Sequence, residues 1–347
     1  MNLATALEAT LSNPDVTDIH FTDGGPVWIR AGRTLVPHPD GIALEPGELN
    51  AWLSDNYFRN DPVARLEELG GDADFAYSTP NCRLRAQAFL SSGHLSLAMR
   101  RLSDSAIEFN QLGLPQIILD LAVRPRGMFL VTGQTGSGKS TTLAAMINHL
   151  NKNEQQHIIT IEDPVEYLYQ NDQCLITQRE VKRDTESYAR ALRAALREDP
   201  DTILIGEIRD RETMEIALSA AETGHLVFAT LHTNNTVATI ERVASFFDGA
   251  AKAAAMSVFG TVINGIICQQ RLFDKAGKTV IVPEILVPTD SIRANIRKSD
   301  TVAITQDMRI GSRDGQLLFD SALRDLMDAG RIDVETARFY ATEPDRM

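Results

Sequence analysis

One short stretch, residues 133–140, limits what this chain can fold into more than any other. Its letters are GQTGSGKS, and they fit the phosphate-loop pattern G-x-x-x-x-G-K-[ST] at every position. The glycines let the backbone approach a bulky anion with positive φ, and the start of the following helix adds N–H groups and a positive dipole end. The lysine is expected to bind the β- and γ-phosphates, and the last serine to ligate Mg²⁺. The residues predicted to contact the nucleotide are Gly133, Gln134, Thr135, Gly136, Ser137, Gly138, Lys139, Ser140 and Thr141.

The neighbouring sequence supports this interpretation. Residues 127–132 form an apolar run of strand length, and Leu143, Ile147 and Leu150 follow the loop at helical spacing. Strand, loop and helix therefore come in the order that a phosphate loop needs. A flexible glycine loop without function is the alternative, and this context disfavours it. The sequence predicts a site for a nucleoside triphosphate such as ATP.

Composition narrows the class of protein. The 347 residues suffice for two domains with separate cores, and the apolar runs are too short for a membrane span. The N-terminal residues show no signal-peptide pattern, so a cytoplasmic location is expected. The three cysteines, Cys82, Cys174 and Cys268, lie far apart, which argues against a disulfide framework and against a zinc site. A net charge of −13 makes nucleic acid an improbable main partner.

Hydrophobic periodicity divides the chain into two parts, joined by a polar stretch at residues 102–113. Residues 1–101 read as a small α+β domain. Residues 114–347 alternate apolar strands with amphipathic helices and become mostly helical beyond residue 250. This alternation predicts a largely parallel sheet covered on both faces, so the expected fold class is α/β with a smaller α+β domain before the P-loop core.

The expected elements are assigned from periodicity and turn residues. In the first part they are helices at 3–11 and 46–57 and strands at 18–21, 26–30, 74–77, 83–90 and 95–101. In the second part they are strands at 127–132, 158–161, 202–205, 226–231 and 279–286, and helices at 141–150, 185–197, 212–222 and 315–327.

Acidic residues follow two of the strands predicted in the second part. Glu162, Asp163 and Glu166 come after one of them, and Glu207 comes after another. Because ligands bind beyond the carboxyl ends of parallel strands, we expect these acids to converge on the phosphate loop. Ordinary solvent-exposed acids at strand ends are the alternative.

Glu207 is the acid predicted to orient the attacking water. In enzymes that hydrolyse a nucleoside triphosphate at a phosphate loop, the motif after this strand ordinarily ends in Asp-Glu. Here Gly206 stands before the glutamate. The acid that usually helps to hold the metal is therefore missing. We expect Glu162 or Asp163 to take over that role.

Three arginines, Arg190, Arg193 and Arg197, are spaced i, i+3 and i+7, which places them on one face of the predicted helix. One of them is expected to reach the phosphates of its own or a neighbouring subunit's nucleotide, as an arginine finger does. A solvated stripe of charge is the alternative. Further candidates for this role are Arg209, Arg100 and Arg101.

Two histidines, His225 and His232, flank the strand predicted at 226–231. Thr230, Thr233 and Asn234 add neutral polar groups around His232. Such a cluster after a buried strand is typical of a sensor that reports the γ-phosphate to the next part of the chain. Purely structural histidines are the alternative.

Taken together, several blocks of this sequence resemble those of the type II/IV secretion ATPase superfamily, and most of all its type IV pilus retraction branch. In sequence order the blocks are TDIH at 17–20, GQTGSGKSTTL at 133–143, TIEDP at 160–164, QREV at 178–181, ALRAALREDP at 191–200, AAETGH at 220–225 and TLHT at 230–233. A match spread over most of the chain is far more specific than the phosphate loop alone.

The resemblance implies a RecA-like P-loop core with a PAS-like N-terminal domain, assembled as a homo-hexamer at the cytoplasmic face of the inner membrane. It implies Mg²⁺-dependent ATP hydrolysis that powers pilus retraction and twitching motility through an inner-membrane platform protein. Nucleotide is expected between the two domains, with arginines of the first closing over it. By position, Glu162, Asp163 and Glu166 fall in the family's Asp box, Gly206 and Glu207 in its modified Walker B motif, and His225 and His232 in its His box.

Two departures from related motors bear on which machine is served. The chain lacks the tetracysteine zinc loop of assembly and type II secretion motors, which favours the retraction branch. The retraction signature at residues 291–298 reads SIRANIRK, so Lys298 stands where that branch has an acid. A motor of type IVB secretion or conjugation is therefore an alternative. A nucleic-acid translocase and a non-hydrolysing regulator are further ones.

Overall fold

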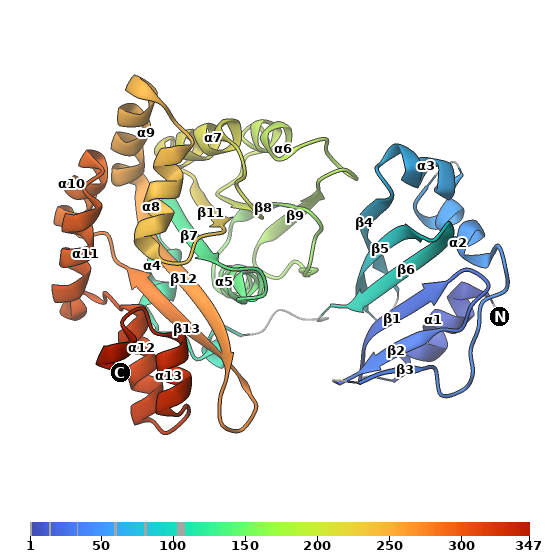
Figure 1. Cartoon of the computed structure of the whole chain (residues 1–347). Helices are drawn as coiled ribbons and strands as arrows, with labels where there is room; N and C mark the ends of the chain where they lie inside the picture. Colours follow the sequence, from blue (N-terminus) through green and yellow to red (C-terminus); the bar gives the residue numbers. More distant parts are fainter. Residues whose placement is uncertain (1, 14, 33, 59–60, 80–81, 103–107) are drawn as a thin grey trace. The chain divides into compact units, whose positions relative to one another are not determined.

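The computed structural model describes residues 2–13, 15–32, 34–58, 61–79, 82–102 and 108–347 of the chain. Their contacts divide the chain into two units, residues 1–105 with 166–168 and residues 106–165 with 169–347 (Figure 1). Each unit has a hydrophobic core of its own. Residues 103–107 of the predicted connection lie outside the described residues, so the domain limits given above stay a prediction.

The first unit is built on a six-stranded antiparallel sheet with the order β3-β2-β1-β6-β5-β4. The strands are β1 (Val16–Thr22), β2 (Trp28–Ala31), β3 (Thr34–Pro37), β4 (Asp72–Ser78), β5 (Arg83–Ser91) and β6 (His94–Arg101). The helices beside it are α1 (Leu3–Leu11), α2 (Glu48–Asn56) and α3 (Pro62–Glu68).

Local sequence explains most of this unit. Leu3, Leu7 and Leu11 lie on one side of α1 and are buried in the core, as their spacing predicts. Ser92 and Gly93 both take positive φ, which makes the tight turn between β5 and β6. Strand β3 was not predicted, because all four of its residues are exposed and the strand therefore has no apolar alternation.

The second unit is built on a seven-stranded sheet with the order β13-β12-β7-β11-β10-β8-β9. Neighbouring strands run parallel except β13, which pairs antiparallel with β12 at one edge. The predicted α/β class and the largely parallel sheet are therefore confirmed. The strands are β7 (Gly127–Gly133), β8 (His157–Glu162), β9 (Leu175–Glu180), β10 (Thr202–Ile205), β11 (Leu226–Leu231), β12 (Ile263–Phe273) and β13 (Thr279–Leu286).

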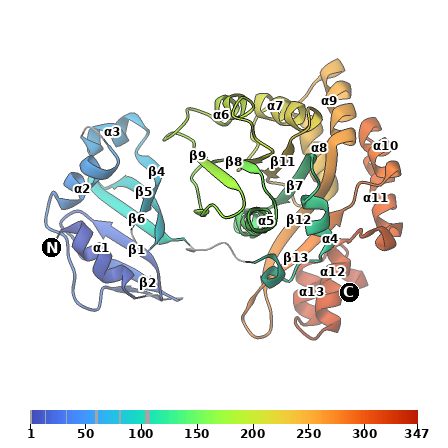
Figure 2. The same ribbon diagram turned by 180° about the vertical axis from the view of Figure 1, so that it is seen from behind.

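Helices cover both faces of this sheet because its central strands are apolar on both sides. In β7, Met128 and Leu130 face one layer of the core, and Phe129 and Val131 face the other. The first layer lies under α6 (Tyr188–Ala195), α7 (Arg211–Glu222), α8 (Thr236–Ser245), α9 (Gly249–Val262), α10 (Asp290–Lys298) and α11 (Thr301–Ile310). The second lies under α4 (Ile117–Ala122) and α5 (Lys139–Asn153), and Figure 2 shows α4 beside β12. A small third cluster joins α12 (Phe319–Asp328) and α13 (Val334–Tyr340) to the ends of β12 and β13.

Two predictions beyond residue 250 were wrong. Strand β12 is an eleven-residue element that the sequence analysis assigned to the helical part. Its first seven residues are all buried, polar Asn264 and Gln269 included, so the strand shows no alternation of apolar and polar residues by which periodicity could identify it. The helix expected from residue 315 begins at Phe319, because Leu317 is held in an extended bridge to Ile285. Gly330 does follow its end, with φ of 69°.

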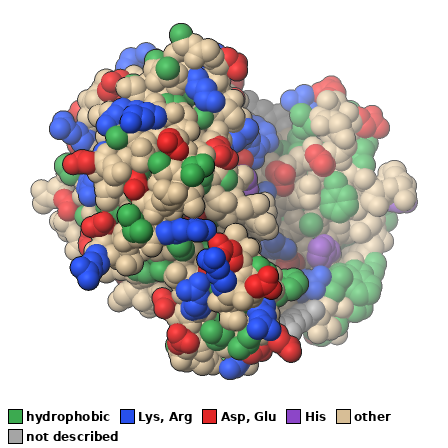
Figure 3. Space-filling view, turned by 60° about the vertical axis from the view of Figure 1, so that its left-hand side comes forward, with side chains coloured by type: hydrophobic (Ala, Val, Ile, Leu, Met, Phe, Trp, Pro, Cys, Tyr) green, Lys and Arg blue, Asp and Glu red, His purple; other side chains and the backbone are tan. Residues whose placement is uncertain are grey.

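The surface of the second unit carries both signs of charge. On the face that Figure 3 shows, Lys and Arg side chains lie interspersed with Asp and Glu side chains. This face therefore has a mixed charge rather than one continuous basic patch. Among the described residues, no helix has both the length and the apolar composition needed to span a bilayer.

Candidate active site

The phosphate loop connects β7 to the first turn of α5 and needs glycine at three positions. Gly133, Gly136 and Gly138 take φ values of 137°, 80° and 97°, in the region that side chains disfavour. A Cβ at position 133 would lie 2.3 Å from the carbonyl oxygen of Gln269 on the neighbouring strand β12. The loop is therefore held tightly against the sheet, and its backbone turns into the N-terminus of a fifteen-residue helix. This is the geometry of an anion-binding cradle.

Polar groups of the loop are arranged for a ligand. The ammonium of Lys139 donates hydrogen bonds to the carbonyl oxygens of Gly133 (2.9 Å) and Gln134 (3.1 Å). Ser137 is buried, and its hydroxyl oxygen has no hydrogen-bond partner among the described residues. A buried hydroxyl without a partner is costly unless something else supplies one. The loop therefore fits a phosphate group.

The remaining predicted contacts lie in the loop and at the start of the helix. The side-chain amide of Gln134 donates to the side-chain oxygen Oδ1 of Asn234 at 3.4 Å, and Thr135 is exposed. Ser140 and Thr141 stand in the first turn of α5, both half-buried. Among the described residues, no group of three or more His, Cys, Asp or Glu side chains is arranged to hold a metal ion. Mg²⁺ in phosphoryl-transfer sites is held largely by phosphates and water, so one hydroxyl such as that of Ser140 is compatible with it.

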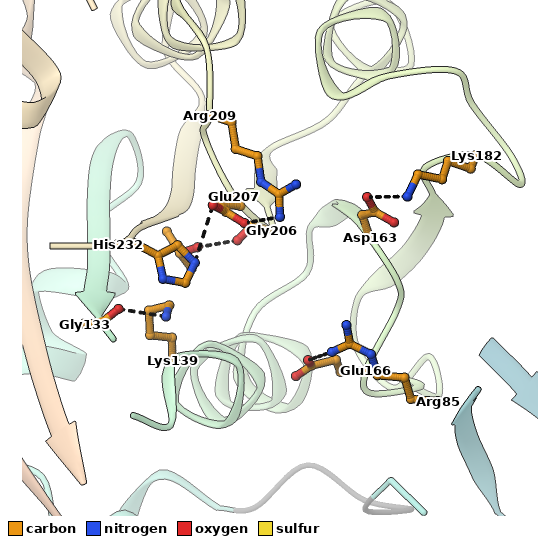
Figure 4. Close-up of polar contacts among 11 residues, drawn as sticks. Arg85, Gly133, Lys139, Asp163, Glu166, Lys182, Gly206, Glu207, Arg209 and His232 are labelled. Atoms are coloured by element: carbon orange, nitrogen blue, oxygen red, sulfur yellow. Dashed lines mark hydrogen bonds and ion pairs between the residues drawn. The ribbon is translucent and has the colours of Figure 1, made fainter. Parts of the chain in front are cut away.

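Glu207 follows β10 after one residue, Gly206, and lies at the edge of the sheet where the phosphate loop begins (Figure 4). Its carboxylate accepts a hydrogen bond from Arg209 at 2.6 Å and is 3.4 Å from Nε2 of His232. Burial opposes ionisation of Glu207, but the hydrogen bond and charge of Arg209 and the charges of His232 and Lys139 outweigh it and hold its pKa below the usual value. Glu207 is therefore a charged carboxylate on the same side of the molecule as Lys139.

His232 follows β11 and completes this group. Burial and the positive charge of Lys139 lower its pKa below that of an ordinary histidine, although the nearby Glu207 opposes the shift. The imidazole is therefore mainly neutral near pH 7. Because its pKa is lower in the folded than in the unfolded chain, its contribution to stability is lost as the pH falls below the usual histidine pKa.

The pKa of His232 offers a direct test of this arrangement. Lys139→Met should raise the pKa, because a positive charge is removed, and Glu207→Gln should lower it further, because a negative charge is removed. NMR titration of the imidazole Hε1 resonance, assigned with a His232→Gln variant, measures both shifts. Lys152→Met, at the other end of α5, is the matched control and should leave the pKa unchanged. A His232 pKa that does not respond to Lys139→Met would contradict the geometry described here.

The polar residues around His232 connect this edge of the sheet to α8. Thr230 donates to the carbonyl oxygen of Gly206, which ties the ends of β10 and β11 together. The Thr233 hydroxyl is 2.7 Å from that of Thr239 in α8. The segment after β11 is thus connected to the helix that follows it. Such a connection is what a phosphate sensor requires.

The other predicted acids lie in two places. Glu162, at the end of β8, accepts a hydrogen bond from Thr160 at 2.7 Å, and Asp163 pairs with Lys182 at 3.4 Å. Strand β8 neighbours β10, so both acids share the sheet edge with Glu207. Glu166 belongs instead to the first unit, where its carboxylate is 3.8 Å from Arg85.

The predictions for the arginines had different outcomes. The helix containing Arg190 and Arg193 ends at Ala195, so Arg197 does not share a helix face with them, and that prediction was wrong. After Ala195 the chain continues in tighter turns, in which the backbone N–H groups of Arg197 and Glu198 donate to the carbonyl oxygens three residues before them.

The other arginines have partners within their own units. Arg193 pairs with Glu212 of α7, and Arg190 pairs with Glu186 at 2.5 Å. In the first unit, Arg100 donates to Asp18 at 2.7 Å, and Arg101 donates to the carbonyl oxygens of Leu11 and Asn13. A role for any of them at a nucleotide stays a prediction. Of the described arginines proposed for this role, Arg209 is the one whose printed ion pair is with a predicted catalytic residue, Glu207.

His225 lies at the opposite end of β11 from His232. Its Nδ1 atom is 2.9 Å from the carbonyl oxygen of Ala220, in the last turn of α7. This setting is that of a structural histidine.

Sequence reasoning missed two side chains beside the site. A guanidinium nitrogen of Arg271, on β12, lies 3.7 Å from where a Cβ of Gly136 would be. The hydroxyl of Tyr188, the first residue of α6, lies 3.2 Å from where a Cβ of Gly206 would be. Neither belongs to a recognised motif, and only the packing of β12 and α6 onto the sheet brings them there.

These features define a class of protein. A glycine-rich phosphate loop, a charged strand-end glutamate and a strand-end histidine at one edge of a parallel sheet make a P-loop nucleoside triphosphatase. Residues 70–279 match the family described as Type II/IV secretion system protein, and the chain belongs to this family. It is accordingly a nucleotide-using ATPase.

Known proteins resemble the chain over nearly its whole length. The type IV pilus retraction ATPase PilT of Pseudomonas aeruginosa is 38% identical over 346 residues, which cover 98% of each chain. A crystal structure of the pilus retraction motor PilT with bound ADP has a TM-score of 0.90 at 37% identity and covers 100% of this chain and 99% of that one. The ATPase DotB of Legionella pneumophila has a TM-score of 0.85 at 27% identity and covers 97% of this chain and 94% of its own.

Proposed function

We propose that this chain is the Mg²⁺-dependent ATPase of a hexameric motor that retracts type IV pili and so powers twitching motility. The observation that carries the proposal is the meeting of Lys139 and Glu207 at one sheet edge, within a chain that matches a pilus retraction ATPase from end to end. The hexamer, an inner-membrane platform protein as partner, and a place at the cytoplasmic face of the inner membrane belong to this proposal. So do the domain limits 1–101 and 114–347 with a linker at 102–113.

In the proposed reaction, the phosphates of ATP replace the loop carbonyl oxygens as partners of the Lys139 ammonium. Water attacks the terminal phosphorus, the bond to the ADP oxygen breaks, and the proton of the water passes to Glu207. The products are ADP and inorganic phosphate. When bound, Mg²⁺ supplies charge neutralisation at the phosphates, and Ser140 is the side chain proposed to hold it.

Glu207 is ionised, as a proton acceptor must be, but in the structure it is held by Arg209. Arg209 therefore restrains the carboxylate until ATP binds. Neutral His232, whose Nε2 atom is 3.4 Å from the Glu207 carboxylate, is proposed as the group that senses the terminal phosphate. The link from Thr233 to α8 then carries the signal.

Deletion of the gene in the host cell tests whether the chain drives pilus retraction. Deleting the gene should leave pili on the cell surface and abolish twitching motility, because assembly continues without retraction. Expression of the wild-type chain should restore motility, and expression of the Lys139→Ala variant should not. Twitching zones and pilus counts by electron microscopy measure both effects. Unchanged motility and unchanged pili in the deletion strain would contradict the retraction assignment, while ATP turnover by the purified chain would still stand.

A motor of type IVB secretion or conjugation is the second candidate. Lys298, in place of the acid expected in the retraction signature, and the likeness to the ATPase DotB favour it. Loss of effector secretion or of DNA transfer in the deletion strain, with normal pili, would select it. A nucleic-acid translocase is a weaker candidate because the net charge is −13, and DNA-stimulated ATPase activity with steep salt dependence would support it.

A further inference from the structure

Gly206 stands where the strand-end motif of P-loop enzymes ordinarily has the aspartate of an Asp-Glu pair. The structure shows which atoms lie where the side chain of that aspartate would be. A Cβ at position 206 would lie 3.2 Å from the hydroxyl oxygen of Tyr188, 3.2 Å from the carbonyl oxygen of Ile161 and 3.3 Å from Cα of Glu162. An aspartate at 206 would therefore compete with the Tyr188 hydroxyl for the same place. The glycine and the tyrosine are complementary: one leaves the space and the other brings an oxygen atom to it.

Tyr188 is held in place by the start of its helix and by the core. It is the first residue of α6, directly after the N-cap Ser187, whose side chain accepts a hydrogen bond from the backbone N–H of Arg190. Its ring packs against the core between α6 and the sheet. The hydroxyl is thereby directed toward the carboxyl edge of the sheet, where Gly206 lies.

Tyr188 is a neutral hydroxyl in a field of negative charge. Burial raises its pKa above that of an ordinary tyrosine, and the charges of Asp163, Glu207 and Glu162 raise it further against the opposing effect of Arg209. The phenol therefore keeps its proton at every working pH and can donate one hydrogen bond.

The Tyr188 hydroxyl makes no hydrogen bond to another described residue, and it is not among the buried polar atoms that lack a partner, so water can reach it. A neutral donor in the field of nearby carboxylates, open to water and not hydrogen-bonded to the protein, is an arrangement that can hold a water molecule between the donor and the carboxylates. Resting on the function proposed above, we infer that Tyr188 donates a hydrogen bond to a water shared with Glu207 and Asp163. Tyr188 thereby positions the water that Glu207 directs at the terminal phosphate.

Tyr188→Phe tests this inference because it removes only the hydroxyl and keeps the ring. The variant should lower kcat by about tenfold, the effect of one hydrogen bond that acts in the transition state, and leave the affinity for a fluorescent ATP analogue unchanged. The melting temperature should also stay unchanged, since no protein group loses a partner. Tyr340→Phe, at the end of α13 and half-buried, makes the same chemical change outside the site and should turn over ATP like the wild type.

A double-mutant cycle separates a positioning role from a structural one. If Tyr188 and Glu207 act on the same water, Tyr188→Phe should cause little further loss in a Glu207→Gln background, measured by single-turnover hydrolysis of radiolabelled ATP. The same fold-loss in both backgrounds, or full activity of Tyr188→Phe alone, would overturn the inference. If instead the wild-type chain hydrolyses no ATP, the proposed function itself is wrong.

Discussion

Lys139→Ala should abolish nearly all ATP turnover and weaken nucleotide binding together. The ammonium is the charge that we propose binds the phosphates, and it lies against two loop carbonyl oxygens that a phosphate can displace. Loss of a phosphate-clamping group of this kind costs on the order of 10²-fold or more in rate. Phosphate release by the purified chain and titration with a fluorescent ADP analogue measure the two effects.

A matched control lies on the same helix. Lys152→Ala removes an equal charge from the last turn of α5, where the side chain pairs with Glu108. This variant should hydrolyse ATP at the wild-type rate. Equal activity of Lys139→Ala and Lys152→Ala would refute the assignment of the loop as the ATP site.

Glu207→Gln should separate binding from chemistry. Glutamine keeps the size of the side chain but cannot accept a proton, so kcat should fall on the order of 10²-fold or more, while ATP remains bound. The loss of the charged hydrogen bond from Arg209 leaves that arginine free to approach the phosphates, so the affinity for ATP should not decrease. Single-turnover hydrolysis and equilibrium ATP binding are the two measurements.

Glu215→Gln is the control for this prediction. Glu215 is an exposed acid of α7 that pairs with Arg211 at 2.8 Å, so the substitution removes a comparable ion pair away from the sheet edge. Turnover should be unaffected. A Glu207→Gln enzyme that retained the wild-type kcat would exclude Glu207 as the proton acceptor and return the role to Glu162 or Asp163.

Patterns that are contiguous in the sequence could be predicted well. The phosphate loop is a backbone structure made by eight consecutive residues, and its glycine requirement is visible in the letters. The place of Glu207 could be predicted from a rule of topology, because acids that follow parallel strands gather at one edge of the sheet. The α/β class followed from the alternation of strands and helices.

Features that depend on where an element ends, or on which element packs beside it, could not be predicted from the sequence. Arg197 does not share the expected helix face with Arg190 and Arg193, because α6 ends at Ala195, less than one helical turn before it. Strand β12 could not be recognised from the sequence, because burial on both sides removes the alternation of apolar and polar residues that marks a strand. Glu166 follows the same strand as Glu162, yet its contacts are with the first unit.

By itself the sequence determined that this chain binds a nucleoside triphosphate, since the residues that make the cradle are neighbours along the backbone and their chemistry needs no distant partner. Only the tertiary structure decided which side chains share the space with it. Tyr188 and Gly206 are far apart in the sequence and carry no common pattern, and they meet because α6 packs across the ends of β8 and β10. Contacts of this kind are set by the close packing of elements, which short-range patterns do not encode.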